Sequence, residues 1–349
     1  MWPYWLMYLF PAMQAILVPG KLLRHGHRLK ISWIVTGILF VLLIGFREQV
    51  GGDWPNYLRR YHEIYGLSLY DVLQKGDPGY MALSWLMMDW DWGIYGINLA
   101  CALVFVSGLI VFCLQQYKPW LAFAVAVPYL IIVVAMGYTR QSVALGLIFW
   151  ALAYLEQGHF KRYLFFVSVA VLFHKTAVLM IPLGLFLYKK GWLLRLIAVV
   201  LAGYGLWDTF VSVDQERLWN TYVEQQMMSE GARIRVFMNT IPSLMLLLYW
   251  KRWRISFPNP AFWLVIAFAS IACVFLVGFA STAVDRMALY FTPIQVAVFS
   301  RLPYLANRRF TPRAVTFMVL SGYALVLFVW LNYAGHTYAW LPYRNLLFE

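Results

Sequence analysis

The chain has 349 residues, of which 62% are hydrophobic and only 12% are charged. This balance excludes a soluble globular protein, because such domains carry about 25% charged residues. The formal net charge of +13 could indicate nucleic-acid binding, but the lysines and arginines lie in short segments between apolar runs. There they indicate membrane orientation and contacts with anionic lipid.

Apolar runs recur along the chain at about the length of a helix that crosses a hydrocarbon core of roughly 30 Å. We therefore predict one all-α domain over residues 1–349, a polytopic membrane bundle with about 10–12 transmembrane helices. The predicted spans are 2–19, 31–46, 94–116, 119–137, 141–157, 162–174, 176–188, 192–207, 236–250, 260–279, 287–301 and 315–333.

The basic residues predict the orientation of these spans. They gather at alternate gaps, namely 21–30, Lys118, 161–162, 189–195, 251–254 and 301–313. Positively charged gaps face the cytoplasm, so both termini are expected on the other side. The first run has no basic segment before it, which favours a retained helix over a signal peptide.

The segment from Tyr163 to Tyr188 permits two interpretations. A single helix would bury His174 and Lys175 at mid-depth and invert every later loop. Two short elements that meet at His174 keep all basic clusters on one side, and we favour this alternative. Each element is then only about 18 Å long, so it must be re-entrant, be extended at its ends, or lie in thinned membrane.

Two loops on the non-cytoplasmic side, residues 47–93 and 208–235, are large enough to build a site. In the first, residues 79–92 are too short to span and predict a helix at the membrane interface. Pro78 and Gly79 predict a turn before it. Asp77 is in position to cap its first turn, and a direct ligand role is the alternative.

The start of the first loop combines a cation, two glycines and a carboxylate, in Arg47, Gly51, Gly52 and Asp53, followed by Tyr57. Glycines allow close approach of a ligand to the backbone, and an acid beside aromatic rings suits a sugar. The alternative is a tight turn whose arginine extends to the interface.

Arginines also lie at the outer ends of several predicted helices. Arg140 with Gln141 and Arg286 both start predicted spans, where a guanidinium adds to the positive end of a helix dipole and suits phosphate. Arg233 and Arg235 add further outer cations, so these arginines together predict an electropositive pocket for a membrane-anchored pyrophosphate. Asp285 is interpreted either as part of this pattern or as the partner that neutralises Arg286.

His174 and Lys175 stand at the predicted break. Histidine exchanges protons near neutral pH, which makes His174 a candidate acid or base, although structural packing is the commoner role of a lone histidine. The three cysteines lie inside apolar runs, and no zinc, phosphate-loop or nucleophile-elbow motif is present. We therefore predict no metal and no cofactor.

The order of these residues resembles the EpsG family of bacterial exopolysaccharide polymerases, which are related in role to Wzy O-antigen polymerases. The resemblance covers residues from about 40 to 300, and its most specific part is the Arg-Gln helix start followed by Phe-His-Lys. The matching residues are Arg47, Gly52-Asp53, Tyr57, Asp77-Pro78-Gly79-Tyr80, Arg140-Gln141, Phe173-His174-Lys175, Arg286 and Leu289-Tyr290-Phe291.

The resemblance implies a GT-C-like, multi-pass glycosyltransferase of the bacterial cytoplasmic (inner) membrane. It would transfer a growing glycan from undecaprenyl pyrophosphate to the next lipid-linked repeat unit at the outer face. Its partners would be this lipid-linked oligosaccharide, membrane lipid and a separate chain-length regulator, with no nucleic acid.

Our hypothesis gives roles to two sets of residues. Catalytic roles go to Arg140, His174, Asp53 and Arg286, with His174 or Asp53 as the general base. Substrate-binding roles go to Arg47, Gln141, Lys175, Asp77, Tyr57, Arg233, Arg235 and Tyr290.

Three other functions are compatible with a polar site in a helical membrane protein. A ligase would use the same donor with a different acceptor. A flippase for a lipid-linked sugar would place charges near the midplane and show an inverted repeat, and neither feature is visible in the sequence. A membrane acyltransferase would need access for its acyl donor from the cytoplasmic side, where the loops carry mainly lysine and arginine.

Overall fold

The computed structural model describes residues 1–21, 28–185, 196–197, 200, 204, 231–279, 281–306 and 310–348. Within these residues every regular element is a helix, and the extended pairing is an isolated bridge between Arg47 and Asn345. The predicted all-α membrane fold is confirmed. The predicted span 192–207, apart from four residues, and the loop residues 208–230 lie outside the described residues.

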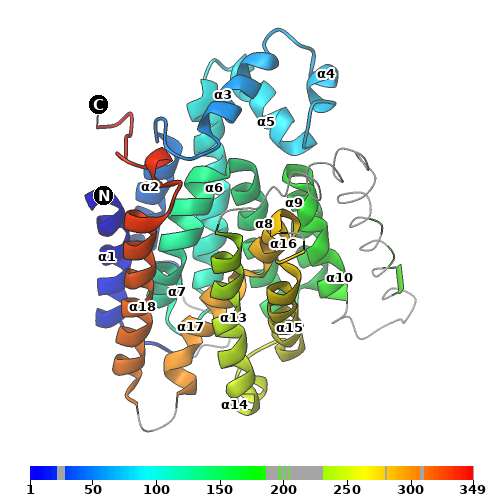
Figure 1. Cartoon of the computed structure of the whole chain (residues 1–349). Helices are drawn as coiled ribbons and strands as arrows, with labels where there is room; N and C mark the ends of the chain where they lie inside the picture. Colours follow the sequence, from blue (N-terminus) through cyan, green and yellow to red (C-terminus); the bar gives the residue numbers. More distant parts are fainter. Residues whose placement is uncertain are drawn as a thin grey trace.

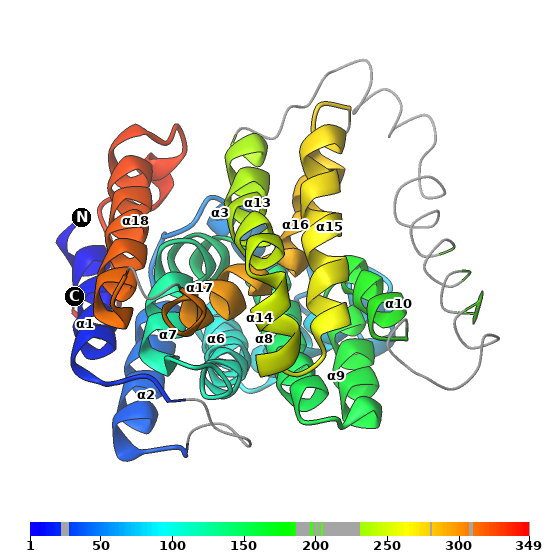
Figure 2. The same ribbon diagram turned by 90° about the horizontal axis from the view of Figure 1, so that it is seen from below.

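The long helices run roughly side by side (Figure 1). They are α1 (Trp2–Leu17), α2 (Ile31–Gly45), α6 (Gly93–Cys113), α7 (Pro119–Ala126), η1 (Val127–Ala135), α8 (Thr139–Glu156), α9 (Phe160–Phe173), α13 (Ala232–Leu248), α15 (Pro260–Leu276), α16 (Ser281–Phe291), α17 (Pro293–Leu305) and α18 (Pro312–Tyr333). Seen from below, α1 and α18 lie at one side and α9, α10 and α15 at the other, with α7, α8 and α17 between them (Figure 2).

The remaining described helices are short. They are α3 (Trp54–Glu63), α4 (Leu69–Leu73), α5 (Pro78–Asp89), η2 (Lys175–Leu179), α10 (Met180–Leu185), α14 (Trp250–Ser256) and η5 (Thr337–Ala339). The first three cover one end, where both termini also lie, and α14 lies at the opposite end (Figure 1). We call the end that carries α3–α5 the capped end.

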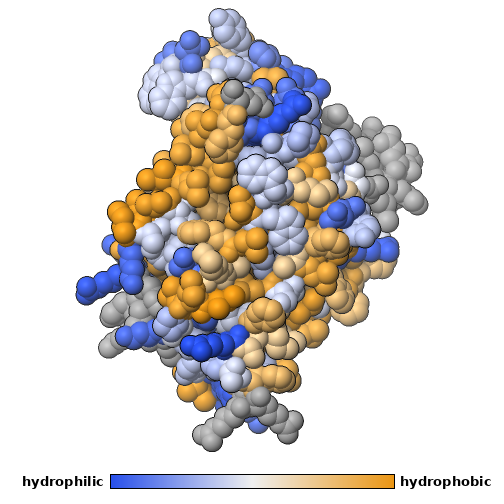
Figure 3. Space-filling model, turned by 90° about the vertical axis from the view of Figure 1, so that its left-hand side faces the viewer, coloured by the Kyte–Doolittle hydropathy of each residue, from blue (hydrophilic) through white to orange (hydrophobic). Residues whose placement is uncertain are grey.

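On the face that carries α1, apolar side chains form a band between two more hydrophilic ends (Figure 3). Among the described helices, α6 with 21 residues and α18 with 22 are long and apolar enough to cross a bilayer. Shorter apolar helices, α2, α7 with η1, and α15, stand beside them. This arrangement fits a bundle in hydrocarbon, where helices satisfy their own backbone groups.

Close helix contact in the core depends on glycine. A Cβ atom added at Gly146 of α8 would lie 2.5 Å from Phe105 Cα of α6, and one at Gly108 would lie 2.0 Å from Gly146 O. Small residues at such crossings let helix backbones approach in membranes, where packing drives association. This contact fixes α8 against α6, and α8 carries Arg140.

We expect Gly146→Ala to lower the free energy of unfolding by about 1–3 kcal/mol, because the new methyl overpacks a backbone contact. The matched control is Gly322→Ala in α18, where an added Cβ meets nothing within 4 Å. For both variants the midpoint of thermal unfolding in detergent is measured from the loss of the monodisperse fraction. Equal midpoints would contradict the close contact.

The helix break at His174 is confirmed. His174 has φ −159° and ψ 116°, which is extended backbone, and it separates α9 from η2. Both η2 and α10 contact α9 again, so the chain turns back beside the helix it has just left. The alternative of one continuous helix from Tyr163 is therefore wrong.

Proline shapes two other helices. The run 119–137 is helical as predicted, but residues 127–135 are a π-helix, in which Pro128 has no N–H to donate to Ala124. The predicted span 287–301 is wrong in its bounds, because α16 ends at Phe291 and α17 begins at Pro293. Pro293 has no N–H for the carbonyl of Leu289, which interrupts the helical bonding at this position.

The C-terminal segment after α18 folds back over the loop that follows α2. The N–H of Gly51 donates to Ala339 O at 2.8 Å, and that of Leu346 donates to Phe46 O at 2.9 Å. The indole of Trp340 donates to Ile132 O at 2.8 Å. Gly51 has φ +108° and its Cα hydrogen faces Met136 O, where a Cβ would lie at 2.2 Å, so this position needs glycine.

Candidate active site

Three predicted residues from distant parts of the sequence meet near the capped end. Arg140 Nη1 donates to Asp77 Oδ2 at 2.8 Å, and His174 Nδ1 lies 3.8 Å from the same oxygen. Arg140 lies in the first turn of α8, Asp77 immediately precedes α5, and His174 occupies the break after α9. The helix break thus positions the imidazole beside a carboxylate that Arg140 already holds.

Asp77 occupies the N-cap position of α5, but its side chain makes no capping hydrogen bond. The predicted capping role is therefore wrong. Pro78 at the first helical position has no N–H, and Arg140 offers the carboxylate a stronger, charge-assisted bond. Burial acts to raise the pKa of Asp77, but His174 and Arg140 together lower it below the usual value.

Asp53 has a similar place at the start of α3, and again its side chain makes no capping bond. It is half-buried, and burial raises the pKa of its carboxyl against the opposing effects of Asn56 and the arginines Arg140, Arg60 and Arg286. The structure thus brings Asp53, Arg140 and Arg286 into one electrostatic neighbourhood. Arg60 was missed by the sequence analysis, although it lies seven residues, or about two helical turns, after Asp53.

Two tyrosines support the start of α8. The backbone N–H of Arg140 donates to the Tyr57 hydroxyl at 3.4 Å, and the rings of Tyr57 and Tyr80 lie 5.8 Å apart. Tyr57 is only 6% exposed. Its ring therefore packs behind Arg140 and presents little surface for stacking on a sugar. Tyr80 was missed as a site residue, although its neighbours Asp77 and Pro78 were singled out.

Several buried polar atoms around Asp77 have no hydrogen-bond partner among the described residues. They are Arg140 Nε, both ring nitrogens of His174, Thr176 Oγ1, and the hydroxyls of Tyr80 and Tyr290. Tyr290, a predicted site residue on α16, is 1% exposed and lies near Thr176 and Asp77. Buried polar groups normally have partners, so such a concentration marks a candidate ligand site.

Arg47 lies deeper than predicted, at 1% exposure. Its guanidinium donates to Ile44 O at 2.7 Å, Met136 O at 2.9 Å and Thr139 Oγ1 at 2.8 Å. These bonds tie the end of α2 to the start of α8. Arg47 therefore contacts protein groups that position Arg140, and its donors do not face an opening.

We expect Arg47→Met to lower the free energy of unfolding by at least about 2–3 kcal/mol, since several buried acceptors lose their donor. The same substitution at Arg59, an exposed arginine of α3, should change it by at most about 0.5 kcal/mol. The midpoints of thermal unfolding in detergent compare the two. If both variants unfold like the wild type, the anchoring role of Arg47 is excluded.

The other predicted cations divide into paired and exposed groups. Arg235 of α13 binds Asp285 of α16 through two hydrogen bonds, Nε–Oδ1 at 2.7 Å and Nη2–Oδ2 at 2.6 Å. The interpretation of Asp285 as the partner of Arg286 is therefore wrong. Arg233, Arg286 and Lys175 are exposed, and Gln141 is half-buried.

Within the described part of the chain, no three His, Cys, Asp or Glu side chains come together in a metal-binding arrangement. Cys101, Cys113 and Cys273 are buried and free. The groups that the structure gathers around Asp77 are guanidinium, carboxylate, imidazole and hydroxyl.

The fold and this site define a helical membrane protein with a polar, arginine-containing site near one end of an apolar bundle. The EpsG family model matches residues 30–345, nearly the whole chain, so the protein belongs to the EpsG family. Membership gives it a polysaccharide-polymerase-like role in polysaccharide biosynthesis. No curated protein and no solved structure matches the chain.

Proposed function

We propose that the protein extends a polysaccharide by moving the growing glycan from undecaprenyl pyrophosphate to the next lipid-linked repeat unit. The observation that supports this most is the part-buried contact of Arg140 and His174 with Asp77, near buried polar atoms that find no partner among the described residues. A phosphate- and sugar-bearing substrate supplies both the anion for Arg140 and the partners for the hydroxyls.

In this proposal the donor pyrophosphate binds at Arg140. Asp77 holds Nη1, while Nε is buried with no partner among the described residues and would donate to a phosphate oxygen as its partner. Arg140 lies in the first turn of α8, where the helix dipole also favours an anion. Arg286 and Lys175, both exposed, add positive charge to the leaving pyrophosphate.

Asp53 is the general base in this proposal. A hydroxyl of the acceptor sugar attacks the anomeric carbon of the donor, and its proton passes to the Asp53 carboxylate. The new glycosidic C–O bond forms as the C–O bond to pyrophosphate breaks, and the pyrophosphate leaves with the electron pair. A carboxylate with a raised pKa is a stronger base than an ordinary aspartate.

His174 serves here as a positioning residue. Its two ring nitrogens are buried, whereas Asp53 is half-buried, which favours Asp53 for contact with an acceptor hydroxyl. The imidazole lies against Asp77 and thereby helps to fix the carboxylate that orients Arg140. Gln141, Tyr290, Arg233 and the Arg235–Asp285 pair are proposed to contact the sugars.

The basic residues support an outward-facing site. The exposed Lys161, Arg162, Lys251 and Arg254 and the buried Lys118 belong to the gaps between spans on the side opposite α3–α5 (Figure 1). Positively charged gaps face the cytoplasm, so the capped end is proposed to face outward from the bacterial cytoplasmic membrane. A lipid-linked donor would then reach Arg140 from the outer leaflet.

Reconstitution tests the proposal. The purified protein in nanodiscs receives its organism's undecaprenyl-pyrophosphate-linked repeat unit, and the products are resolved on a gel. We expect a ladder of repeat units without nucleotide or a second kind of acceptor. Arg59→Ala, which removes an exposed arginine of α3, is the control and should retain the ladder.

Other outcomes would overturn the proposal. Transfer that occurs only when a different acceptor is supplied would make the protein a ligase. Movement of the lipid-linked unit between leaflets, with no covalent product under any condition, would make it a transporter.

A further inference from the structure

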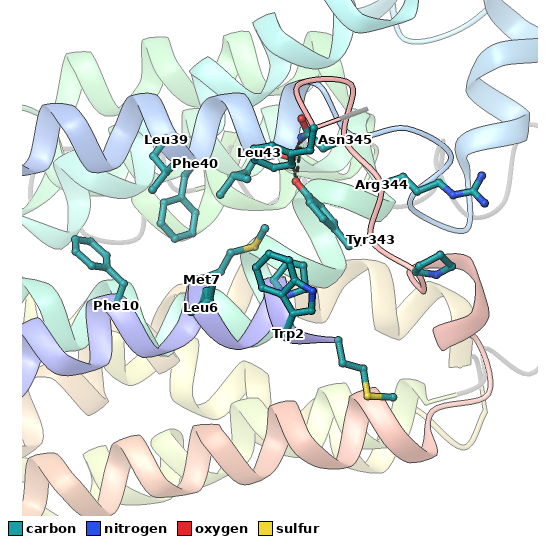
Figure 4. Close-up of a pocket in the computed structure, with 14 residues that line it drawn as sticks. Trp2, Leu6, Met7, Phe10, Leu39, Phe40, Leu43, Tyr343, Arg344 and Asn345 are labelled. Carbon is teal, nitrogen blue, oxygen red and sulfur yellow. Dashed lines mark hydrogen bonds between the residues drawn. The ribbon is translucent and has the colours of Figure 1, made fainter.

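An apolar groove runs between α1 and α2 beneath the C-terminal segment (Figure 4). Its volume is about 720 Å³, which lies within the roughly 300–1,000 Å³ typical of small-ligand sites. Trp2, Leu6 and Phe10 of α1 face Leu39 and Leu43 of α2 across it, and Arg344 lies at one end.

The groove is accessible from the lipid-facing side of the bundle. Trp2 is 72% exposed, Leu6 57% and Leu39 46%, so the apolar walls continue onto the outer surface. The wall from Trp2 to Phe10 rises about 12 Å at 1.5 Å per residue. That is close to one leaflet of a hydrocarbon core of roughly 30 Å.

Only the end of the groove near the C-terminal segment is polar. Tyr343 Oη donates to Leu43 O at 2.8 Å and Asn345 Nδ2 donates to the same oxygen at 3.2 Å, so both side chains are engaged with α2. Arg344 is exposed and extends beyond the apolar part of the groove (Figure 4). Its guanidinium donates a long hydrogen bond, 3.4 Å, to Gln49 Oε1.

We propose that this groove binds an anionic phospholipid from the leaflet at the capped end. One acyl chain lies between α1 and α2, and the headgroup phosphate lies at Arg344. The apolar wall has the length of one leaflet, and the cation stands where a headgroup would be.

The position of the groove argues against the tail of the sugar donor as its occupant. None of the residues that line it belongs to the Arg140–Asp77–His174 site. Arg47, 1% exposed, is packed between the C-terminal segment and Thr139. A polyprenyl chain lying in the groove would therefore not present its pyrophosphate to Arg140.

A lipid in this groove would also stabilise the C-terminal segment on the loop after α2. The residues beside Arg344 pair with the loop after α2, because Glu48 N–H donates to Arg344 O at 3.1 Å and Asn345 bridges Arg47. The lipid would hold this segment in place from outside. It would thus also restrain Arg47, the arginine that positions α8.

Native mass spectrometry of the purified full chain tests the proposal directly. The protein is titrated with phosphatidylglycerol and, separately, with phosphatidylcholine of the same acyl chains. We expect preferential phosphatidylglycerol adducts, with about fivefold weaker binding in Arg344→Ala, the effect of roughly one basic residue near an anionic lipid. Arg344→Lys should retain the preference.

Two further variants make the test specific. Lys75→Ala removes an exposed cation of the α4–α5 connection, away from the groove, and should bind phosphatidylglycerol like the wild type. Leu39→Trp fills the groove and should weaken both phospholipids, while size-exclusion chromatography confirms its fold.

Equal phosphatidylglycerol binding by the wild type, Arg344→Ala and Leu39→Trp would overturn the proposal. Displacement of the phospholipid by undecaprenyl phosphate at equal concentration would also overturn it, in favour of a substrate chain. Since binding alone is read out, the result does not depend on the polymerase activity.

Discussion

Arg140→Ala is expected to lower the rate of polymer formation by about a hundredfold or more, the cost of removing one preorganised charge from a transition state. The structure connects Arg140 to Asp53, Asp77 and His174 together, since Arg140 binds Asp77 at 2.8 Å, His174 lies beside the same carboxylate, and Arg140 lowers the pKa of Asp53. In the proposed mechanism loss of Arg140 removes the charge that stabilises the leaving pyrophosphate. The rate of ladder formation in nanodiscs measures the effect.

Arg140→Lys separates charge from geometry. Lysine keeps the positive charge but has no Nε donor beside a second nitrogen held by Asp77, so it should recover only a small part of the rate. Arg59→Ala provides the control at the same end of the bundle. If Arg140→Ala forms polymer at the rate of Arg59→Ala, Arg140 does not stabilise the leaving group.

The sequence predicts the elements of this fold better than their local contacts. Apolar runs and basic gaps identify most of the spans, and the charge balance correctly places a break at His174. These features depend on one-dimensional patterns that the membrane imposes. The break inside 287–301 was missed because a run of apolar residues outweighed the signal of Pro293.

Pairing between distant segments is the part that sequence could not give. Asp285 is adjacent to Arg286 in sequence, but it binds Arg235, fifty residues away. From its position in the sequence, Arg47 was expected to be an outer cation. In the structure the C-terminal segment covers the loop beside it, and its guanidinium donates to buried protein groups such as Ile44 O. No local sequence pattern indicates that the C-terminal segment folds back onto this loop.

The two aspartates show the same limit at the site. Both stand at helix N-caps with a proline in the first two helical positions, and for Asp77 this context predicted a local capping role. Neither side chain caps its helix. Asp77 instead binds Arg140 at 2.8 Å, and Asp53 lies within the electrostatic influence of the same guanidinium. Only the folded bundle shows that α8 brings Arg140 to both.

Asp53→Asn is expected to lower the rate by about 10²–10⁴-fold, the usual contribution of a general base. The base acts in its ionised form, so activity should rise with pH through the pKa of Asp53. Burial raises this pKa, and the acid limb of the pH profile should therefore lie above the usual value of about 3.9 for aspartate. Asp53→Glu should retain an acid limb, whereas Asp53→Asn should lose it.

Arg60→Ala tests the assignment through the position of that limb. Arg60 is one of the cations that lower the pKa of Asp53 against the effect of burial. Without this cation the pKa rises further, and the acid limb should move to higher pH with little change at the plateau. His174→Gln, in contrast, should lower the plateau and leave the limb in place, because His174 acts through Asp77. If His174→Gln abolishes the limb and Asp53→Asn preserves it, the histidine is the base and Asp53 is not.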